Sequence, residues 1–298
     1  MTEAERKQII ALVQREVVPA IGCTEPIAVA LCVAKATETL GAKPEKIDVL
    51  LSANILKNAM GVGIPGTGMI GLPIAIALGA LIGKSEYQLE VLKDSNPAAV
   101  EEGKRFIGEK RIDISLKKNI TEKLYIEVCC KSGGNKATAI IAGGHTTFIY
   151  IARDGDVLLN KQSAGCGEEE AQVAGLTLRK VYDFAMNAPL DEIRFILETA
   201  RLNKAAAERS FDGNYGHGLG RMLRGNYEHK ILGDSVFSHI LSYTSGACDA
   251  RMAGAMIPVM SNSGSGNQGI SATLPVLVYA EENGKSEEEL IRASCSAI

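Results

Sequence analysis

The sequence predicts an α+β fold, namely a helical domain with an inserted α/β lobe that contains a mostly antiparallel sheet. Apolar residues recur at helical spacing near both ends of the chain, most clearly over residues 2–18, 191–204 and 286–298. Strand-like runs rich in β-branched residues follow one another in the middle, over residues 112–152. Because helical regions flank the strands, we expect both ends of the chain to build one domain around the lobe.

The predicted domain boundaries follow from this change of pattern. Residues 1–43 and 163–298 are expected to form a helical domain, and residues 44–162 to form the inserted lobe. With 298 residues, the chain is long enough for two lobes that each have a hydrophobic core.

Composition and charge restrict the class of protein. The chain is 46% hydrophobic and 22% charged, as globular proteins usually are, and its net charge is −3. Nucleic-acid binders usually carry a basic surplus, so we expect no nucleic-acid partner. The seven cysteines are an odd number, and the first 18 residues do not resemble a secretory signal. These features favour reduced thiols and a cytoplasmic protein.

Two helices and a strand are expected first. The apolar residues of the helix over residues 2–18 lie on one face. After a short break, a second helix is expected to run to about Leu40, with Thr24 as its N-cap and Pro26 in its first turn. Alternation of apolar residues over residues 47–51 then predicts a strand.

An uncharged stretch over residues 58–83 has to be weighed as a membrane span. Its seven glycines and two prolines leave only residues 72–82 for a helix. Such a helix is roughly 16 Å long, whereas the hydrocarbon core of a bilayer is roughly 30 Å thick. We therefore expect a loop followed by a buried core helix, and no membrane partner.

The remaining elements alternate between strand and helix signals. Pro97 follows Asn96 and opens a helix at its first position. The Ser-Gly-Gly-Asn run at residues 132–135 is typical of a hairpin connection. The strands are expected over residues 112–116, 124–130, 137–142 and 146–152.

Cys23 is the cysteine whose position most favours reactivity. It precedes a predicted helix, whose dipole and free N–H groups favour a thiolate that could bind a metal or act as a nucleophile. The alternative is a small buried residue at a tight turn. Cys32 would lie on the opposite side of the helix, and Cys129 and Cys130 on opposite faces of a strand, so these cysteines are poor co-ligands. The sequence contains no Cys-x-x-Cys pair that would indicate zinc.

A polar and glycine-rich segment follows the first strand. Asn54, Lys57 and Asn58 precede the glycines of residues 61–68, whose backbone N–H groups could line an anion pocket. Lys57 could supply a positive charge, or act as a base if it is buried. The spacing is not that of a nucleotide-binding loop.

The run over residues 261–269 combines small polar residues with glycines before a helix expected from about Ile270. Hydroxyls, amides and a helix N-terminus together suit a carboxylate. A flexible linker is the alternative, but both flanks have core-like composition, so we expect an ordered ligand loop. Its candidate ligand-binding side chains are those of Ser261, Asn262, Ser263, Ser265 and Asn267.

Two histidines and one further glycine-rich run complete the candidates. His145 and His217 each follow a glycine and could act as general bases, although an isolated histidine is more often structural. Residues 163–167, which include Cys166, precede three glutamates at 168–170. Those glutamates are best explained as partners of a helix dipole.

Four runs, taken in order, resemble one family. They are GCTEP (22–26), SANILKNAMGVGIPGTGMIG (52–71), SAGCGEEEAQVAG (163–175) and DARMAGAMIPVMSNSGSGNQGI (249–270). Together they are similar to the L-cysteine desulfidase family, which is related to the α chain of iron–sulfur L-serine dehydratases.

This resemblance implies a cytosolic lyase with a [4Fe–4S] cluster. Three cysteines would hold the cluster, and the open iron would act as a Lewis acid on the substrate. A base removes the α-proton of cysteine while sulfide leaves from the β-carbon, and the aminoacrylate product hydrolyses to pyruvate and ammonia. Members that act on serine lose water instead.

The resemblance carries over only one cluster ligand, Cys23. The family's other two cysteines follow the SNSGSGNQG helix, one of them in a Cys-Asp-Gly-Ala-Lys run that is missing here. Cys166, Cys248 and Cys295 match no ligand position. We therefore expect either a truncated chain or a protein without the cluster. The apolar face of the last predicted helix continues to the end of the chain, which suggests a fragment or a homodimer.

Two functions remain possible. The first is iron–sulfur-dependent β-elimination of L-cysteine or L-serine, in which Lys57 or His145 moves the proton. The second is a cluster-free binding or regulatory protein that keeps the amino-acid pocket. In the first, the residues expected to bind the substrate are Asn54, Asn58, Ser261, Asn262, Ser263, Ser265 and Asn267.

Overall fold

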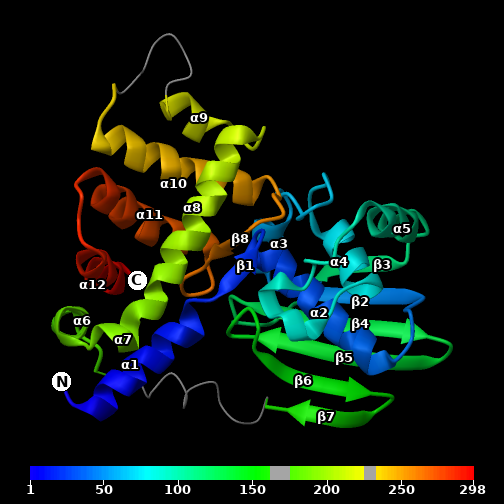
Figure 1. Cartoon of the computed structure of the whole chain (residues 1–298). Helices are drawn as coiled ribbons and strands as arrows, with labels where there is room; N and C mark the ends of the chain where they lie inside the picture. Colours follow the sequence, from blue (N-terminus) through cyan, green and yellow to red (C-terminus); the bar gives the residue numbers. More distant parts are fainter. Residues whose placement is uncertain (162–174, 225–232) are drawn as a thin grey trace. The chain divides into compact units, whose positions relative to one another are not determined.

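A computed structural model describes residues 1–161, 175–224 and 233–298 (Figure 1). Two compact units emerge from it. One, the helical unit, comprises the described parts of Met1–Ala20, Val173–Ala253 and Ile257–Ile298. The other, the sheet unit, comprises those of Ile21–Gln172 and Gly254–Met256. Helices together with a six-stranded sheet confirm the predicted α+β class.

The sheet unit is built on strands in the order β3-β2-β4-β5-β6-β7. Only β2 and β3 run parallel, and the other four neighbouring pairs are antiparallel, so the predicted mostly antiparallel sheet is confirmed. The elements of this unit are α2 (Thr24–Leu40), β2 (Lys46–Leu51), α3 (Ala53–Ala59), α4 (Leu72–Leu81), η1 (Ser85–Glu90), α5 (Pro97–Gly108), β3 (Ile112–Leu116), β4 (Tyr125–Ser132), β5 (Asn135–Ala142), β6 (Phe148–Arg153) and β7 (Asp156–Asn160).

The hairpin between β4 and β5 forms where the sequence predicted it. Ser132 pairs with Asn135, and the two residues between them, Gly133 and Gly134, have φ of +55° and +88°. A two-residue connection with positive φ at both positions matches the right-handed twist of the strands, and glycine adopts it without strain.

Helix α2 packs on the sheet. Cys32 lies on its buried side and its thiol donates to the carbonyl of Ala139 in β5 at 3.3 Å. Ile126, Val128 and Cys130 alternate along β4 and are fully buried. Because α2 is part of this packing, the sheet unit begins at Ile21, whereas the predicted lobe began at residue 44.

Helix α4 is the predicted buried core helix. It crosses α2 so closely that a Cβ on Gly79 would lie 2.6 Å from the carbonyl oxygen of Ala30. Eight of its ten residues are buried. In the part of the chain that the structure describes, no helix is both long and apolar enough to cross a bilayer.

The helical unit is formed by segments from both ends of the chain. The helix expected over residues 191–204 is divided by the 3-10 turn η3, which separates α7 from α8. Strand β1 pairs with β8 in a two-stranded sheet. The elements are α1 (Glu3–Glu16), β1 (Pro19–Ile21), α6 (Leu178–Asn187), α7 (Leu190–Ile193), η3 (Arg194–Ile196), α8 (Leu197–Asp212), α9 (Leu219–Arg224), α10 (Val236–Met252), β8 (Pro258–Met260), α11 (Gly266–Glu282) and α12 (Glu287–Ala297).

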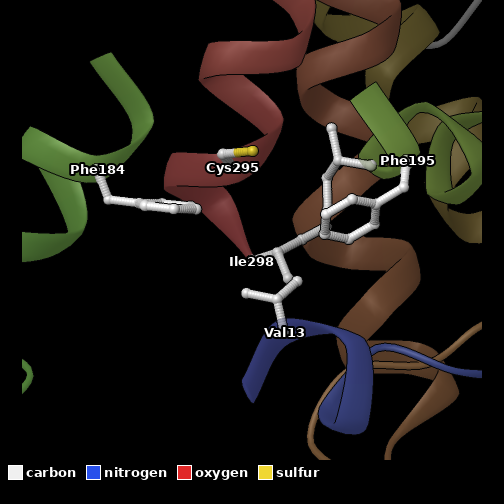
Figure 2. Close-up of a pocket in the computed structure, with 6 residues that line it drawn as sticks. Val13, Phe184, Phe195, Cys295 and Ile298 are labelled. Carbon is white, nitrogen blue, oxygen red and sulfur yellow. The ribbon is translucent and has the colours of Figure 1, made fainter. Parts of the chain in front are cut away.

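Two apolar clusters hold this unit together. The first packs small and aliphatic side chains of α8, α10 and α11. The second joins α1, α6, α7 and α12. Figure 2 shows Val13, Phe184, Phe195 and Ile298 of the second cluster around a cavity of about 10 Å³, which Cys295 also lines. That volume holds about one water molecule, so the cavity is a packing gap and no substrate site.

Candidate functional site

The start of α2 carries a polar cluster in the sheet unit. The helix begins at Thr24 and its N-cap is Cys23, so the expected N-cap at Thr24 was one residue late. Cys23 has extended φ and ψ of −75° and 132°, whereas Thr24 is already helical. The Cys23 side chain makes no capping hydrogen bond, which leaves its thiol available for another partner.

That partner is the carboxylate of Glu25. The Cys23 thiol donates to Glu25 Oε2 at 2.9 Å, and the hydroxyl of Thr24 donates to the same oxygen at 3.2 Å. Asn58, in the last turn of α3, donates from Nδ2 to the other oxygen at 3.3 Å. Two segments of the chain, residues 23–25 and α3, therefore meet at one half-buried carboxylate.

The environment keeps Glu25 ionised at neutral pH. Burial raises the pKa of Glu25, but hydrogen bonds from Cys23, from the backbone N–H of Glu25 and from Thr24, together with the charge of His145, lower it further than burial raises it. The net effect is a pKa below the ordinary value of 4.5. The site therefore has a fixed negative charge directly beside a thiol.

His145 belongs to this electrostatic environment. It lies half-buried in the turn between β5 and β6, and its charge acts on Glu25. Cys23 and Asn58 thus contact Glu25, and His145 acts on it through its charge. Sequence reasoning missed Glu25 because an acid in the first turn of a helix is usually explained by the helix dipole. The Cys-x-Glu spacing at a helix start was the available signal.

Asn54 and Lys57 share α3 with Asn58, but their side chains are exposed. The prediction of Lys57 as a base depended on burial, and the sheet unit leaves this lysine in solvent. His145 is consequently the better placed of the two predicted proton-transfer groups.

The glycine-rich loop forms a small hairpin that supports the cluster. Gly63 bridges Ile70, and Ile64 N–H donates to Met69 O at 2.9 Å. A Cβ on Gly22 would lie 2.5 Å from Cγ of Pro65, so the loop packs directly against the residue before Cys23. The loop also holds itself together through its amides, because those of Ile64, Thr67, Met69 and Gly71 donate to acceptors within the loop, and the Gly66 amide donates to Gly254 O at 3.2 Å. The expected anion pocket therefore has few free donors here.

The predicted ligand loop of the helical unit is an ordered tight turn. Asn262 and Ser265 bridge each other across Ser263 and Gly264, which have φ of +49° and +73°. Helix α11 then begins at Gly266 with Ser265 as its N-cap, four residues before the expected start.

The side chains of this turn are largely used inside the unit. The hydroxyl of Ser261 donates to Val18 O at 2.7 Å, and Asn262 Nδ2 donates to Ile298 O at 3.0 Å. Ser263 donates to Asn262 Oδ1 at 3.0 Å. The hydroxyl of Ser265 accepts from Gln268 N–H, and Asn267 Oδ1 accepts from Arg251. The substrate-binding role predicted for these five side chains remains a prediction.

The described residues do not supply the donors of a three-cysteine cluster. Over residues 1–161, 175–224 and 233–298, no group of three or more His, Cys, Asp or Glu side chains could hold a metal ion. Burial raises the pKa of four thiols: well above the ordinary value for Cys32, to about 12 for Cys130, to a smaller extent for Cys248, and to about 11 for Cys295. Among the described cysteines, only Cys23 lies at a helix start with a polar partner.

Two other predicted features remain predictions. The run at residues 163–170, with Cys166 and the three glutamates, lies outside the described residues. His217 is exposed, and its backbone N–H donates to Asp249 at 3.2 Å.

Comparison with known proteins establishes the family. A family model described as serine dehydratase alpha chain matches residues 86–297, which is more than half of the chain. The chain therefore belongs to the serine dehydratase α-chain family.

Among its relatives, a UPF0597 protein of Bacteroides fragilis is 83% identical over 293 residues, which cover 98% of this chain and 68% of the relative. A UPF0597 protein of Bacteroides thetaiotaomicron is 79% identical over the same coverage. One from Aeromonas hydrophila is 44% identical, covering 98% of this chain and 67% of the relative. No solved structure shows a significant match.

Proposed function

We propose that the protein takes part in β-elimination from a small L-amino acid, L-cysteine or L-serine. Cysteine would give pyruvate, ammonia and sulfide, and serine would give pyruvate and ammonia. Membership of the serine dehydratase α-chain family supports the reaction class. The observation that carries the proposal is the Glu25 cluster, in which a thiol and an amide contact one ionised carboxylate and a histidine acts on it through its charge.

Each group of this cluster has a role in the proposal. His145 accepts the α-proton of the substrate, and the electron pair of the C–H bond forms the new double bond as hydrosulfide or hydroxide leaves the β-carbon with the electron pair of its bond. Water then hydrolyses the aminoacrylate to pyruvate and ammonia. Glu25 interacts with this histidine through their charges. Asn54 and Asn58 orient the amino group of the substrate from one face of α3.

The family resemblance also implies an iron–sulfur cluster, for which Cys23 is the matching ligand. The described residues do not provide a complete donor set for it. The chain spans about two thirds of the length of its relatives, and the activity of the longer proteins is part of the proposal.

Anaerobic reconstitution tests this function. The chain and the longer B. fragilis relative are treated in parallel with ferrous iron and sulfide, desalted, and assayed for bound iron, visible absorbance, pyruvate and released sulfide. We expect iron and turnover in the relative, and their loss in the variant that carries Ser at the position of Cys23. A relative that binds iron but turns over neither amino acid would contradict the proposal.

A second function is a cluster-free protein that binds a small amino acid through the polar groups around Glu25. It predicts that L-cysteine or L-serine raises the melting temperature of the untreated chain without product formation. Absence of any shift, together with turnover in the reconstituted relative, would exclude it.

A further inference from the structure

Arg251 of the helical unit is a buried charge without a counter-charge. It lies in the last turn of α10 and is only 3% exposed. Among the described residues it is the one charged side chain in the buried core. A buried charge lowers the stability of the folded state unless a counter-charge or hydrogen bonds compensate it.

The partners of the guanidinium are few. Nη1 donates to Asn267 Oδ1 at 2.9 Å and contacts the sulfur of Met252 at 3.4 Å, while Nε is buried without any hydrogen-bond partner. Within the described part of the chain, no carboxylate pairs with Arg251. The acid nearest in sequence, Asp249, instead accepts from Leu219 N–H at 2.9 Å at the start of α9.

The guanidinium lies against the first turn of α11. A Cβ on Gly266, the first residue of that helix, would be 2.2 Å from Arg251 Nε and 2.7 Å from Cζ. Ser265 accepts from the N–H groups of Gln268 and Gly269, whereas the N–H groups of Gly266 and Asn267 have no acceptor among the described residues.

Two positive groups are thus adjacent: the N-terminal end of α11 and the Arg251 side chain. The carbonyl end of α10 offsets part of the arginine's charge, but no backbone carbonyl accepts a hydrogen bond from it in the described structure. Among the described residues, Nε of Arg251 is buried without a hydrogen-bond partner, the first N–H groups of α11 have no acceptor, and Gly266 leaves room for the arginine side chain. Such a combination of donors is suited to bind an anion.

We infer that Arg251 and the first turn of α11 bind the carboxylate of a small L-amino acid. The identity of this ligand rests on the proposed function, whereas the anion site itself rests on the geometry. Ser261, Asn262 and Ser263 are less suited to bind the carboxylate, because their side chains already form hydrogen bonds within the unit. Asn267 remains at the site as the side chain that holds Arg251 in place.

Binding of charge-matched probes tests the inference. The untreated chain is titrated with L-serine, with L-serinamide, which lacks the carboxylate, and with inorganic phosphate, with affinity measured by calorimetry and by thermal shift. The variants are Arg251→Met, which removes the charge, and Gly266→Ala, which keeps the charge but places a methyl group against it. Arg209→Met, at an exposed position on α8, is the matched control for the loss of one arginine.

We expect L-serine to bind the wild type and the control, serinamide not to bind, and Arg251→Met to weaken serine binding at least about 30-fold. Gly266→Ala should weaken it as well. Without ligand, Arg251→Met should melt no lower than the wild type, because the substitution removes a buried charge that no carboxylate of the described residues pairs with. A purely structural arginine would instead give a lower melting temperature and leave affinity unchanged in the folded variant, which would overturn the inference.

The remaining outcomes separate this inference from the proposed function. Phosphate binding that depends on Arg251, without serine binding, supports an anion site and overturns the amino-acid ligand. Serine binding that depends on Arg251, without turnover in the reconstituted relative, supports the inference and contradicts the function. Turnover in the reconstituted relative, without any Arg251-dependent binding of serine to the chain, supports the function and overturns the inference.

Discussion

Gly22 adopts a backbone conformation that only glycine tolerates well at this position. Its φ is +78°, and a Cβ would lie 2.5 Å from the ring of Pro65, which cannot rotate away. The residue therefore meets two requirements at once: it forms the turn that leads into Cys23, and it lets the glycine-rich hairpin pack closely against that turn.

Substitution of Gly22 tests this double requirement. We expect Gly22→Ala to destabilise the protein by about 2 kcal/mol or more, because it adds both backbone strain and a clash. Gly61→Ala is the matched control, since a Cβ at Gly61 meets no atom within 4 Å. Calorimetric unfolding of both variants measures the difference, and equal losses of stability would show that the contact with Pro65 does not matter.

Part of the candidate site could be predicted from local sequence patterns. Cys23, Asn58 and His145 were identifiable because a thiol before a helix, an amide after a strand and a histidine after glycines are local signals. Glu25 was not, because its role depends on hydrogen bonds from Cys23 and from Asn58, 33 residues away. Arg251 was missed for the same reason, since burial of an arginine becomes visible only when α10 and α11 pack together.

At the scale of elements, one histidine joins α10 to the end of α11. His239 contacts Glu282 Oε1 through Nδ1 at 2.6 Å and Asp234 Oδ1 through Nε2 at 2.7 Å. The hydrogen bond to Glu282 raises the pKa of His239 above its ordinary 6.5, burial opposes that rise, and Asp234 adds to it.

This arrangement predicts pH-dependent stability. A histidine whose pKa is raised by folding contributes its full stabilisation below the ordinary pKa, and loses it as pH rises through the raised value. We therefore expect His239→Gln to destabilise the protein most at about pH 6 and very little at about pH 9. Urea unfolding at both pH values measures this, with the exposed His217→Gln as control. An equal loss at both pH values would rule out the ion pairs as its cause.

The elements themselves were largely predictable, and the exceptions have a common cause. The hairpin, the helix opened by Pro97 and the core helix α4 follow from local turn chemistry and periodicity. The start of α11 was predicted four residues too late, because its glycines suggested a loop. Both Gly266 and Gly269 are helical positions at which packing requires glycine. A Cβ on Gly266 would lie 2.2 Å from Nε of Arg251, and a Cβ on Gly269 would lie 2.0 Å from the carbonyl oxygen of Met260. Such long-range contacts leave no mark on a local pattern.

At the scale of the whole molecule, the helical unit depends on residues far apart in the chain. Ile9, Ile10 and Val13 of α1 pack in the cluster that contains Phe184 and Ile291. We expect Val13→Asp to destabilise this unit by about 2 kcal/mol, because it places an unpaired charge at a half-buried position in the cluster. Ala11→Asp places the same charge on the exposed side of α1 and should change little. Thermal unfolding followed by circular dichroism compares them, and similar melting temperatures would contradict the packing of α1.

The same separation has a consequence for synthesis. At a translation rate of roughly 5 to 20 residues per second, the apolar face of α1 waits on the order of 15 to 60 s before Ile291 leaves the ribosome. The sheet unit, by contrast, is almost continuous in sequence and can form meanwhile. A nascent chain of this protein therefore carries one folded unit and one unprotected amphipathic helix, which is the kind of segment that chaperones bind.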